Sequence, residues 1–175
     1  MRFNSNNLVA ALKKTGLKKN DTVYFSLNLA AAGFPETIKK KIKKDDLCQI
    51  YFEAISKTIS EDGTILTPAF SYSFGNEKKN PIFNKKKTPS KIGLFSNFIL
   101  KFPNVVRSAD PMLSAAGIGP LAKKILTKIP NRSFGFNTIF DRLSHIKNSK
   151  ICNIGLGKAW FPFIHQLEYL ANVPY

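Results

Sequence analysis

The stretch “KICNIGLG” (residues 150–157) decides the fold class of this chain. It lacks the alternation of polar and apolar residues that marks a half-exposed strand, so it predicts a strand that is covered on both faces. Two further runs also predict strands: “NDTVYFSLNL” (residues 20–29) and “GTILTPAF” (residues 63–70), the second of which is halted by Pro68. Such strands need helices packed against them.

Helical patterns alternate with these strands. Residues 45–60 repeat apolar side chains at helical spacing after two opening aspartates, and residues 6–16 form a shorter apolar face with an asparagine cap before it. Ser90 is expected to cap a helix that carries Ile92 and Phe95. Further helices are predicted at residues 120–129, 137–146 and 162–171, short strands at 104–111 and 114–119, and a long polar loop at 76–90. The alternation predicts an α/β fold, formed by a single domain over residues 1–175.

The chain has a formal net charge of +16, from 27 lysine and arginine residues against 11 acidic ones. Only four of the basic residues are arginines, and the lysines gather in runs at residues 38–44 and 84–87. The charge indicates either a solvated lysine-rich surface or the attraction of a polyanionic small molecule such as a nucleotide or a coenzyme. No nucleic-acid partner is expected, because nucleic-acid readers rely on arginine and no known nucleic-acid-binding motif accompanies the charge.

The ends and the cysteines indicate a cytoplasmic protein without membrane contact. The first ten residues, “MRFNSNNLVA”, contain no apolar segment of the kind found in a signal peptide, and no uncharged apolar run is long enough to span a membrane. Cys48 and Cys152 stand in apolar surroundings without the spacing of metal ligands. Both are therefore expected to be reduced, buried thiols.

His165 and Glu168 are three residues apart, so on a helix they lie on one face. The pair can be two ligands of a metal, a structural contact, or a general base beside an orienting carboxylate. No metal is expected, because His145, the only other histidine, has no partner at ligand spacing. The chain has no G-x-S-x-G, P-loop or G-x-G-x-x-G motif. The structural and catalytic alternatives stay open at this point.

The order of several segments resembles the aminoglycoside 3-N-acetyltransferase family, from about residue 8 to the end of the chain. The segments that carry the resemblance are “GLKKNDTVYFSLNLAAAG” (16–33), “EDGTILTPAFSY” (61–72), “TPSKIGLFSNFILKFPNVVRSADPMLSAAGIG” (88–119), “SFGFNTIFDRL” (133–143), “KICNIGLG” (150–157) and “FIHQLEYLANVPY” (163–175). The resemblance implies a layered α/β sandwich distinct from the GNAT fold. It also implies transfer of acetyl from acetyl-coenzyme A to an amine of an amino sugar.

The resemblance assigns roles to individual residues. His165 matches the catalytic histidine of the family, and Glu168 matches the acidic residue of the same segment. The residues implied for the coenzyme cleft are Ser26, Asn28, Ser90, Arg107, Ser108, Ser114 and Asn137. Among them, Arg107 is expected to contact the phosphates of the coenzyme.

The chain departs from the family pattern at four positions and in its length. Ser26 and Asp110 stand where the family has histidines, Asn28 replaces a serine, and Pro162 replaces a threonine. Family members continue beyond the segment that ends here, so the final helix, apolar over most of its surface, is expected to lack cover. The isolated chain is then expected to dimerise or aggregate, with His165 unusually exposed.

Two classes of function follow from these observations. The first is an acetyl-coenzyme A-dependent N-acetyltransferase, whose acceptor is an aminoglycoside or a nucleotide-linked amino sugar. The nucleotide-linked sugar is preferred, because a strongly basic protein suits an anionic acceptor better than a cationic drug. The second is a catalytically inactive, truncated family member that binds the coenzyme weakly or not at all.

Overall fold

A five-stranded sheet forms the centre of the structure, a computed structural model that describes residues 2–36, 42–76, 82–157 and 160–174. The strands follow the order β5-β6-β4-β2-β7. The strand β2 (Thr22–Leu27) runs parallel to β4 (Thr64–Pro68) on one side and to β7 (Ser149–Ile154) on the other. The strand β6 (Ala115–Ile118) is antiparallel both to β4 and to β5 (Val106–Arg107). The sheet is therefore mixed.

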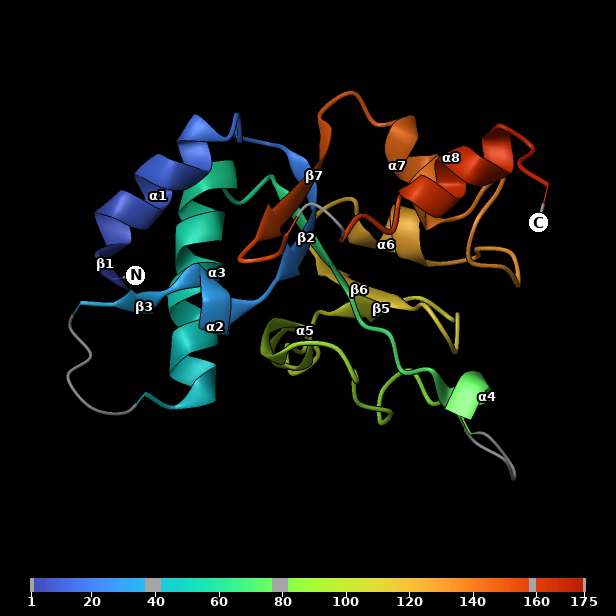
Figure 1. Cartoon of the computed structure of the whole chain (residues 1–175), viewed down its shortest axis with the longest axis horizontal. Coiled ribbons are helices and arrows are strands. Elements are labelled where there is room, and N and C mark those ends of the chain that lie inside the picture. Colours follow the sequence, from blue (N-terminus) through green and yellow to red (C-terminus); the bar gives the residue numbers. More distant parts are fainter. Residues whose placement is uncertain (1, 37–41, 77–81, 158–159, 175) are drawn as a thin grey trace.

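Helices cover both faces of this sheet (Figure 1). On one side lie α1 (Ser5–Lys14), α3 (Lys44–Ile59) and α5 (Leu94–Ile99), and on the other lie α6 (Ala122–Leu126) and α7 (Ile139–Ser144). The remaining elements are β1 (Arg2–Phe3), α2 (Leu29–Ala32), β3 (Phe34–Pro35), α4 (Ser73–Asn76) and α8 (Ile164–Leu170). The predicted layered α/β fold is confirmed.

The side chains of β2 point alternately into the two hydrophobic clusters on either face of the sheet. Val23 and Phe25 point into the cluster that contains α1, α3 and α5, whereas Tyr24 joins Leu66 in the cluster formed with α6 and α7. All four side chains are essentially inaccessible to solvent. Because successive side chains of a strand point to opposite faces, a continuous apolar run fills two cores at once.

The predicted helices at residues 6–16 and 45–60 correspond to α1 and α3. The side chain of Asn4 caps α1 by accepting a hydrogen bond from the backbone N–H of Asn7 at 2.9 Å. Along α3 the buried side chains recur at helical spacing and include Leu47, Tyr51 and Ile55. Here sequence periodicity and tertiary packing agree.

Two predictions about local structure are wrong. The strand β7 was expected to be covered on both faces, but it lies at the edge of the sheet, its side chains are only partly buried, and Asn153 is exposed. Ser90 does not cap a helix, because α5 begins only at Leu94, after Gly93 with φ +71°. The Ser90 hydroxyl instead donates to the carbonyl oxygen of Ile92 at 2.9 Å.

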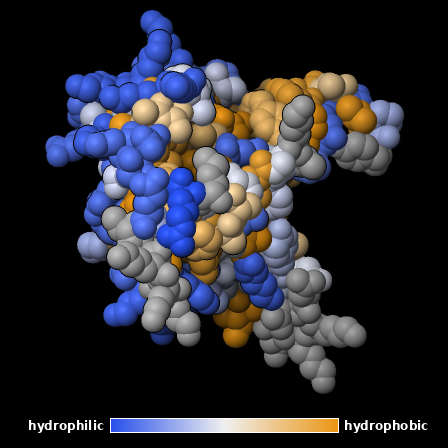
Figure 2. Space-filling view, turned by 60° about the vertical axis from the view of Figure 1, so that its left-hand side comes forward, coloured by the Kyte–Doolittle hydropathy of each residue, from blue (hydrophilic) through white to orange (hydrophobic). Residues whose placement is uncertain are grey.

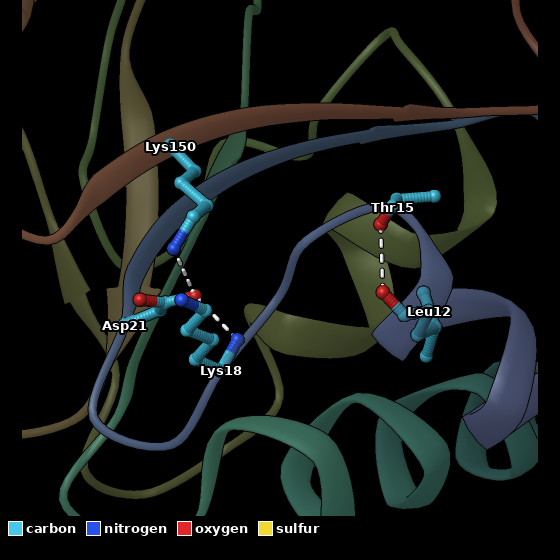
Figure 3. A network of polar contacts seen from close by, with 5 residues as sticks. All are labelled: Leu12, Thr15, Lys18, Asp21 and Lys150. Atoms are coloured by element: carbon cyan, nitrogen blue, oxygen red, sulfur yellow. Dashed lines mark hydrogen bonds and ion pairs between the residues drawn. The ribbon is translucent and has the colours of Figure 1, made fainter.

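A buried carboxylate, that of Asp21 immediately before β2, contacts Lys150 near the start of β7 (Figure 3). Asp21 is 1% exposed, and its Oδ2 accepts hydrogen bonds from Lys150 Nζ at 2.5 Å and from the backbone N–H of Lys18 at 2.7 Å. This ion pair fixes the edge strand to its neighbour at the end of the sheet opposite to the carboxyl ends of the parallel strands.

Two parts of the sequence predictions lie outside the described residues. These are residues 38–41 of the first lysine run and residues 77–81 of the predicted polar loop. Residues 82–90 of that loop contain neither helix nor strand, in agreement with the prediction. Among the residues with described structure, no helix is long and apolar enough to cross a bilayer.

Candidate active site

The contact expected between His165 and Glu168 in the last helix is formed. The Nδ1 atom of His165 lies 2.7 Å from Glu168 Oε2, one turn along α8. An ionised carboxylate only accepts hydrogen bonds, so the contact places the ring proton on Nδ1 and leaves a lone pair on Nε2. The His165 side chain is 55% exposed and that of Glu168 is 28% exposed. The pair can thus hold an imidazole ready to accept a proton at its outer nitrogen.

An open cleft of about 780 Å³ lies over this pair. The ring of Phe134 packs against the imidazole with 5.2 Å between the ring centroids, and Phe136 packs edge-on against Tyr169. Glu168 is the only acidic residue in the lining of the cleft within the described parts of the chain. The lining residues are Leu113, Phe134, Phe136, His165, Glu168, Tyr169, Leu170, Asn172 and Val173.

Gln166 fixes α8 against the loop at residues 133–138. Its side chain is fully buried, and its Oε1 accepts hydrogen bonds from Gly135 N at 2.7 Å and from Thr138 Oγ1 at 3.4 Å. Gly135 has φ +103°, and a Cβ atom at this position would lie 2.8 Å from the Tyr169 ring. Only glycine allows this close approach, which sets the position of the helix that carries His165.

A second pocket of about 430 Å³ lies at the carboxyl end of β2. Ser26 and Asn28 line it, beside the first residues of α5. The carboxyl ends of parallel strands are the common place for a ligand in an open α/β sheet. The structure therefore brings two of the predicted coenzyme residues to a ligand-sized space.

A smaller pocket of about 280 Å³ has walls in common with the other two. His165 and Phe134 line both this pocket and the open cleft. Trp160 lines both this pocket and the one beside Ser26. The three spaces thus form a series that runs from the carboxyl end of β2, past Trp160, to His165.

Arg107 is held by groups of the protein itself, and its expected contact with the coenzyme phosphates remains a prediction. Its guanidinium is buried and donates hydrogen bonds to the carbonyl oxygens of Thr88 and Ala69 and to Ser114 Oγ. The ring of Phe83 lies 5.0 Å from the guanidinium carbon, and burial lowers the pKa of Arg107 to about 10. In this arrangement the side chain ties the 83–88 segment to the sheet.

Three of the predicted serines belong to the same supporting network. Ser114 Oγ donates to the carbonyl oxygen of Ala69 at 2.7 Å, and Ser108 Oγ accepts from the backbone N–H of Ala115 at 2.9 Å. The Ser90 hydroxyl also bonds only to backbone groups. None of these serines lines one of the three pockets. Their implied coenzyme contacts remain a prediction, whereas their structural contacts are clear.

Asn137 lies apart from the His165 cleft. It has φ +64°, and its Oδ1 accepts a hydrogen bond from Arg142 Nε at 2.9 Å. Arg142 in turn donates to the carbonyl oxygens of Lys124 and Thr127, at the end of α6. Asn137 therefore stabilises the contact between α6 and α7, and the neighbouring Phe134 and Phe136 face the cleft in its place.

Sequence reasoning missed Trp160 and Gln166 as site residues. The only signal for Trp160 was its status as the single tryptophan of the chain. Gln166 could have been noticed as a polar residue on a mostly apolar helix. No group of three or more potential metal ligands occurs in the portion of the chain that is described. Burial raises the pKa of each thiol, Cys48 and Cys152, to about 11.

Several solved structures share this fold. AAC-IIIb in a binary complex with CoASH is 19% identical, with a TM-score of 0.81, and the match covers 99% of this chain and 67% of that one. AAC-VIa bound to sisomicin is 24% identical, with a TM-score of 0.78 and coverages of 96% and 65%. The YokD protein from Bacillus subtilis is 23% identical, with a TM-score of 0.78 and coverages of 98% and 72%. The chain thus spans about two thirds of the length of these relatives.

Sequence comparison agrees with the structural likeness. No curated protein sequence matches the chain. Residues 41–175 match the family model described as aminoglycoside 3-N-acetyltransferase. This region contains β4, β7, the His165–Glu168 pair and most of the walls of the three pockets. The chain therefore belongs to the aminoglycoside 3-N-acetyltransferase family.

Proposed function

We propose that the chain is an acetyl-coenzyme A-dependent N-acetyltransferase that acts on an amine of an amino sugar, with His165 as the general base. The observation that carries the proposal is the 2.7 Å contact between His165 Nδ1 and Glu168 at the edge of a ligand-sized cleft. Both residues lie in the region that matches the family model. A histidine oriented by a carboxylate is a common arrangement for accepting a proton.

His165 acts on the acceptor amine. An ammonium group cannot attack a carbonyl carbon, so Nε2 of His165 accepts the proton that the amine must lose. The amine nitrogen then bonds to the acetyl carbon of the thioester and the carbon–sulfur bond breaks. The nitrogen loses a second proton as the amide forms, so that one of the two protons passes to the departing sulfur and the other is released to solvent. Glu168 holds the tautomer with the proton on Nδ1 and stabilises the imidazolium while it exists.

The residues of the chain fit an acetyl donor of the coenzyme A class. The pocket beside Ser26 is largely apolar and leads past Trp160 to His165. Acetyl-coenzyme A supplies the acetyl group as a thioester. The relative AAC-IIIb is described with CoASH bound. The net charge of +16 favours association with the coenzyme phosphates, and this attraction weakens as salt is added.

The preferred acceptor is an uncharged or anionic amino-sugar conjugate, such as a nucleotide-linked amino sugar. Within the described parts of the chain, the cleft over His165 offers a single carboxylate, Glu168, and that carboxylate is already paired with the histidine. A polycationic aminoglycoside would face a strongly basic protein with little acidic surface to receive it. The relative AAC-VIa is described with sisomicin bound, so a kanamycin-type compound is the right comparison in an assay. Faster turnover of that drug would contradict the preference for an anionic acceptor.

A second candidate function is coenzyme binding without transfer. The observation that favours it is the exposure of His165, since a base that is 55% exposed is open to water on one side. This alternative predicts binding of acetyl-coenzyme A without acetylation of any amino sugar.

Calorimetric titration with acetyl-coenzyme A tests the proposal at its first step. Binding is expected at low ionic strength, and the affinity is expected to decrease as salt increases because phosphate contacts are screened. The same titration with coenzyme A that lacks its 3′-phosphate should show a smaller dependence on salt. Absence of binding at low ionic strength would exclude both candidate functions.

A further inference from the structure

A basic groove of about 820 Å³ lies between α6 and α7. The two helices pack on the same face of the sheet (Figure 1). None of the residues that line this groove also lines one of the three pockets that lead from the carboxyl end of β2 to His165. The α6–α7 groove is therefore a separate space, which the proposed function does not use.

Positive charge dominates the wall of the α6–α7 groove. Within the described parts of the chain, its lysine and arginine side chains are Lys123, Lys124, Lys128 and Arg142, and its only acidic one is Asp141. The Asp141 carboxylate already accepts a hydrogen bond from a backbone N–H at 2.6 Å. The three lysines are exposed, and none of their ammonium groups has a partner among the described residues. Because cations around one hollow repel each other and attract anions, the groove favours a multiply charged anion.

Arg142 binds the free carbonyl groups at the end of α6. Its Nη1 donates to the carbonyl oxygens of Lys124 and Thr127, both at 2.7 Å, and its Nη2 donates to that of Lys128 at 2.8 Å. The last carbonyl groups of a helix have no partner inside the helix and carry partial negative charge. Since Arg142 occupies these oxygens, they do not repel an anion that approaches the neighbouring lysines.

The backbone at Lys128 has an unusual conformation, with φ +52°, which a lysine rarely adopts. Asn137, which also lines the groove, has φ +64°, and its Oδ1 accepts a hydrogen bond from Arg142 Nε at 2.9 Å. Arg142 therefore holds both residues. Backbone conformations of this kind persist only where the surroundings fix them, and they are frequent in segments that bind ligands.

The chemistry of the wall indicates which class of anion fits. Lysine ammonium groups bind phosphate as point charges, and three of them around one space match a ligand whose phosphates are adjacent. Among the described residues, no Phe, Tyr or Trp lines the groove, so a nucleic-acid base has no ring on which to stack. The guanidinium of Arg142 is already engaged with carbonyl groups. A small phosphate-bearing molecule therefore fits the groove better than a nucleic acid.

We propose that the α6–α7 groove is a binding site for a small molecule with two or more adjacent phosphates, held by the ammonium groups of Lys123, Lys124 and Lys128. Both a free oligophosphate and the diphosphate of a nucleotide have this chemistry. The site is independent of acetyl transfer at His165, and no covalent step is assigned to any of its residues.

Labelling of lysines with an amine-reactive ester locates the site in the unaltered chain. Inorganic pyrophosphate is expected to slow the labelling of Lys123, Lys124 and Lys128 severalfold, as measured by mass spectrometry. The exposed lysines at residues 85–87 serve as the internal control and should be labelled at an unchanged rate. Equal protection of the two groups would mean that pyrophosphate follows the net charge of the chain, and the assignment would be wrong.

Two variants that lose the same three charges separate the groove from the net charge. The control variant replaces the three lysines at residues 85–87 by glutamine. Calorimetry at low ionic strength should show pyrophosphate binding that is weaker by about tenfold or more in the groove variant, and nearly unchanged in the control. Equal affinities of the two variants, or no binding to the unaltered chain, would overturn the proposal. Equal melting temperatures check that both variants are folded. The groove variant combines Lys123→Gln, Lys124→Gln and Lys128→Gln.

Two further probes identify the source of the phosphates. Binding of ADP that is tighter than that of pyrophosphate, and that the groove variant loses, assigns the site to nucleotides, whereas tighter binding of pyrophosphate assigns it to free oligophosphates. Either result supports the proposal. Binding of a DNA duplex that the groove variant loses, without any binding of pyrophosphate, would show a nucleic-acid surface and would contradict it. Failure to acetylate any amino sugar would leave all these results unchanged.

Discussion

The Oε1 atom of Gln166 lies 2.7 Å from the backbone nitrogen of Gly135, and this bond connects the helix of the candidate base to a loop 31 residues earlier in the chain. Gln166 is fully buried, whereas His165, the preceding residue, faces the cleft. The rotation of α8 about its axis, and with it the direction of the imidazole, depends on this contact. Gln166 is thus a positioning residue for His165.

Substitution of Gln166 by leucine should destabilise the protein by about 1–2 kcal/mol, because Gly135 N would be buried without a partner. The loss is moderated by removal of Nε2, which has no partner among the described residues. The control is Gln49→Ala, which removes an exposed contact to Glu53 on α3. Urea unfolding of the two variants checks the prediction, and equal midpoints would contradict it.

The Asp21–Lys150 ion pair should matter more for stability than the exposed pair between Asp45 and Lys101. Asp21 is buried, so Asp21→Ala leaves Lys150 without its carboxylate and Lys18 N without an acceptor, at a cost of about 3 kcal/mol. The side chains of Asp45 and Lys101 are each 60% exposed, and Asp45→Ala should cost less than about 1 kcal/mol. Unfolding free energies of both variants would show this difference. Similar losses would mean that the buried pair contributes no more than a surface contact.

The raised pKa values of the two thiols should lower the free energy of unfolding at alkaline pH. Burial raises the pKa of Cys48 and Cys152 to about 11, above the value of 9.0 of a free thiol. Between about pH 9 and pH 11 the unfolded chain releases thiol protons that the folded chain retains. The free energy of unfolding should therefore decrease with rising pH across this window, while the contribution is fully present below pH 9.

Comparison with a double variant isolates this contribution. Cys48→Ala combined with Cys152→Ala removes both thiols and should flatten the decrease in unfolding free energy between pH 9 and pH 11. Tyrosine and arginine groups titrate identically in the two proteins, so they cancel in the comparison. The same pH dependence in both proteins would show that the thiols have ordinary pKa values.

An apolar surface surrounds α8 and predicts self-association of the chain. The exposed side chains that form it are Phe136, Ile164, Leu167, Tyr169, Leu170 and Val173. In the space-filling view, apolar residues, shown in orange, gather at the same end of the molecule (Figure 2). Contiguous apolar patches of this kind tend to mark contact surfaces. The purified chain should therefore dimerise or aggregate and bind a hydrophobic dye.

Light scattering and dye fluorescence check this prediction. Leu167→Gln with Leu170→Gln should reduce both signals without unfolding the protein, since these side chains are 42% and 51% exposed. Ile82→Gln is the control, because Ile82 is 77% exposed but belongs to the loop before α5. A dye-negative monomer before substitution would contradict the expectation.

Periodic features of the sequence predicted much of the fold. The continuous apolar run at β2 and the spacing of Leu47, Tyr51 and Ile55 each reflect burial against whole layers, so they are visible in sequence. The edge position of β7 was not visible, because strand order is set by pairing between distant segments. The predicted cap at Ser90 failed since the Asn97 side chain occupies both backbone groups of Ser90.

The candidate site could be predicted only where its residues lie close together in the sequence. His165 and Glu168 meet because they are one helical turn apart, a relation that sequence spacing contains. The partners of Arg107 include backbone carbonyls that folding brings together from distant segments, so these contacts could not be predicted from the sequence. Trp160 approaches the Ser26 pocket from a segment without any periodic pattern, and no rule of spacing points to it.

The central claim is that His165 is the base of an acetyl transfer, and the most direct test is the rate of thiol release from acetyl-coenzyme A in the presence of a nucleotide-linked amino sugar. The account predicts measurable turnover by the unaltered chain and a loss of about 100-fold or more in His165→Ala. It predicts no comparable loss in His145→Ala, whose Nδ1 lies 2.7 Å from Asp141 O on α7, away from the His165 cleft. Turnover that is equally fast without the His165 imidazole would contradict the account.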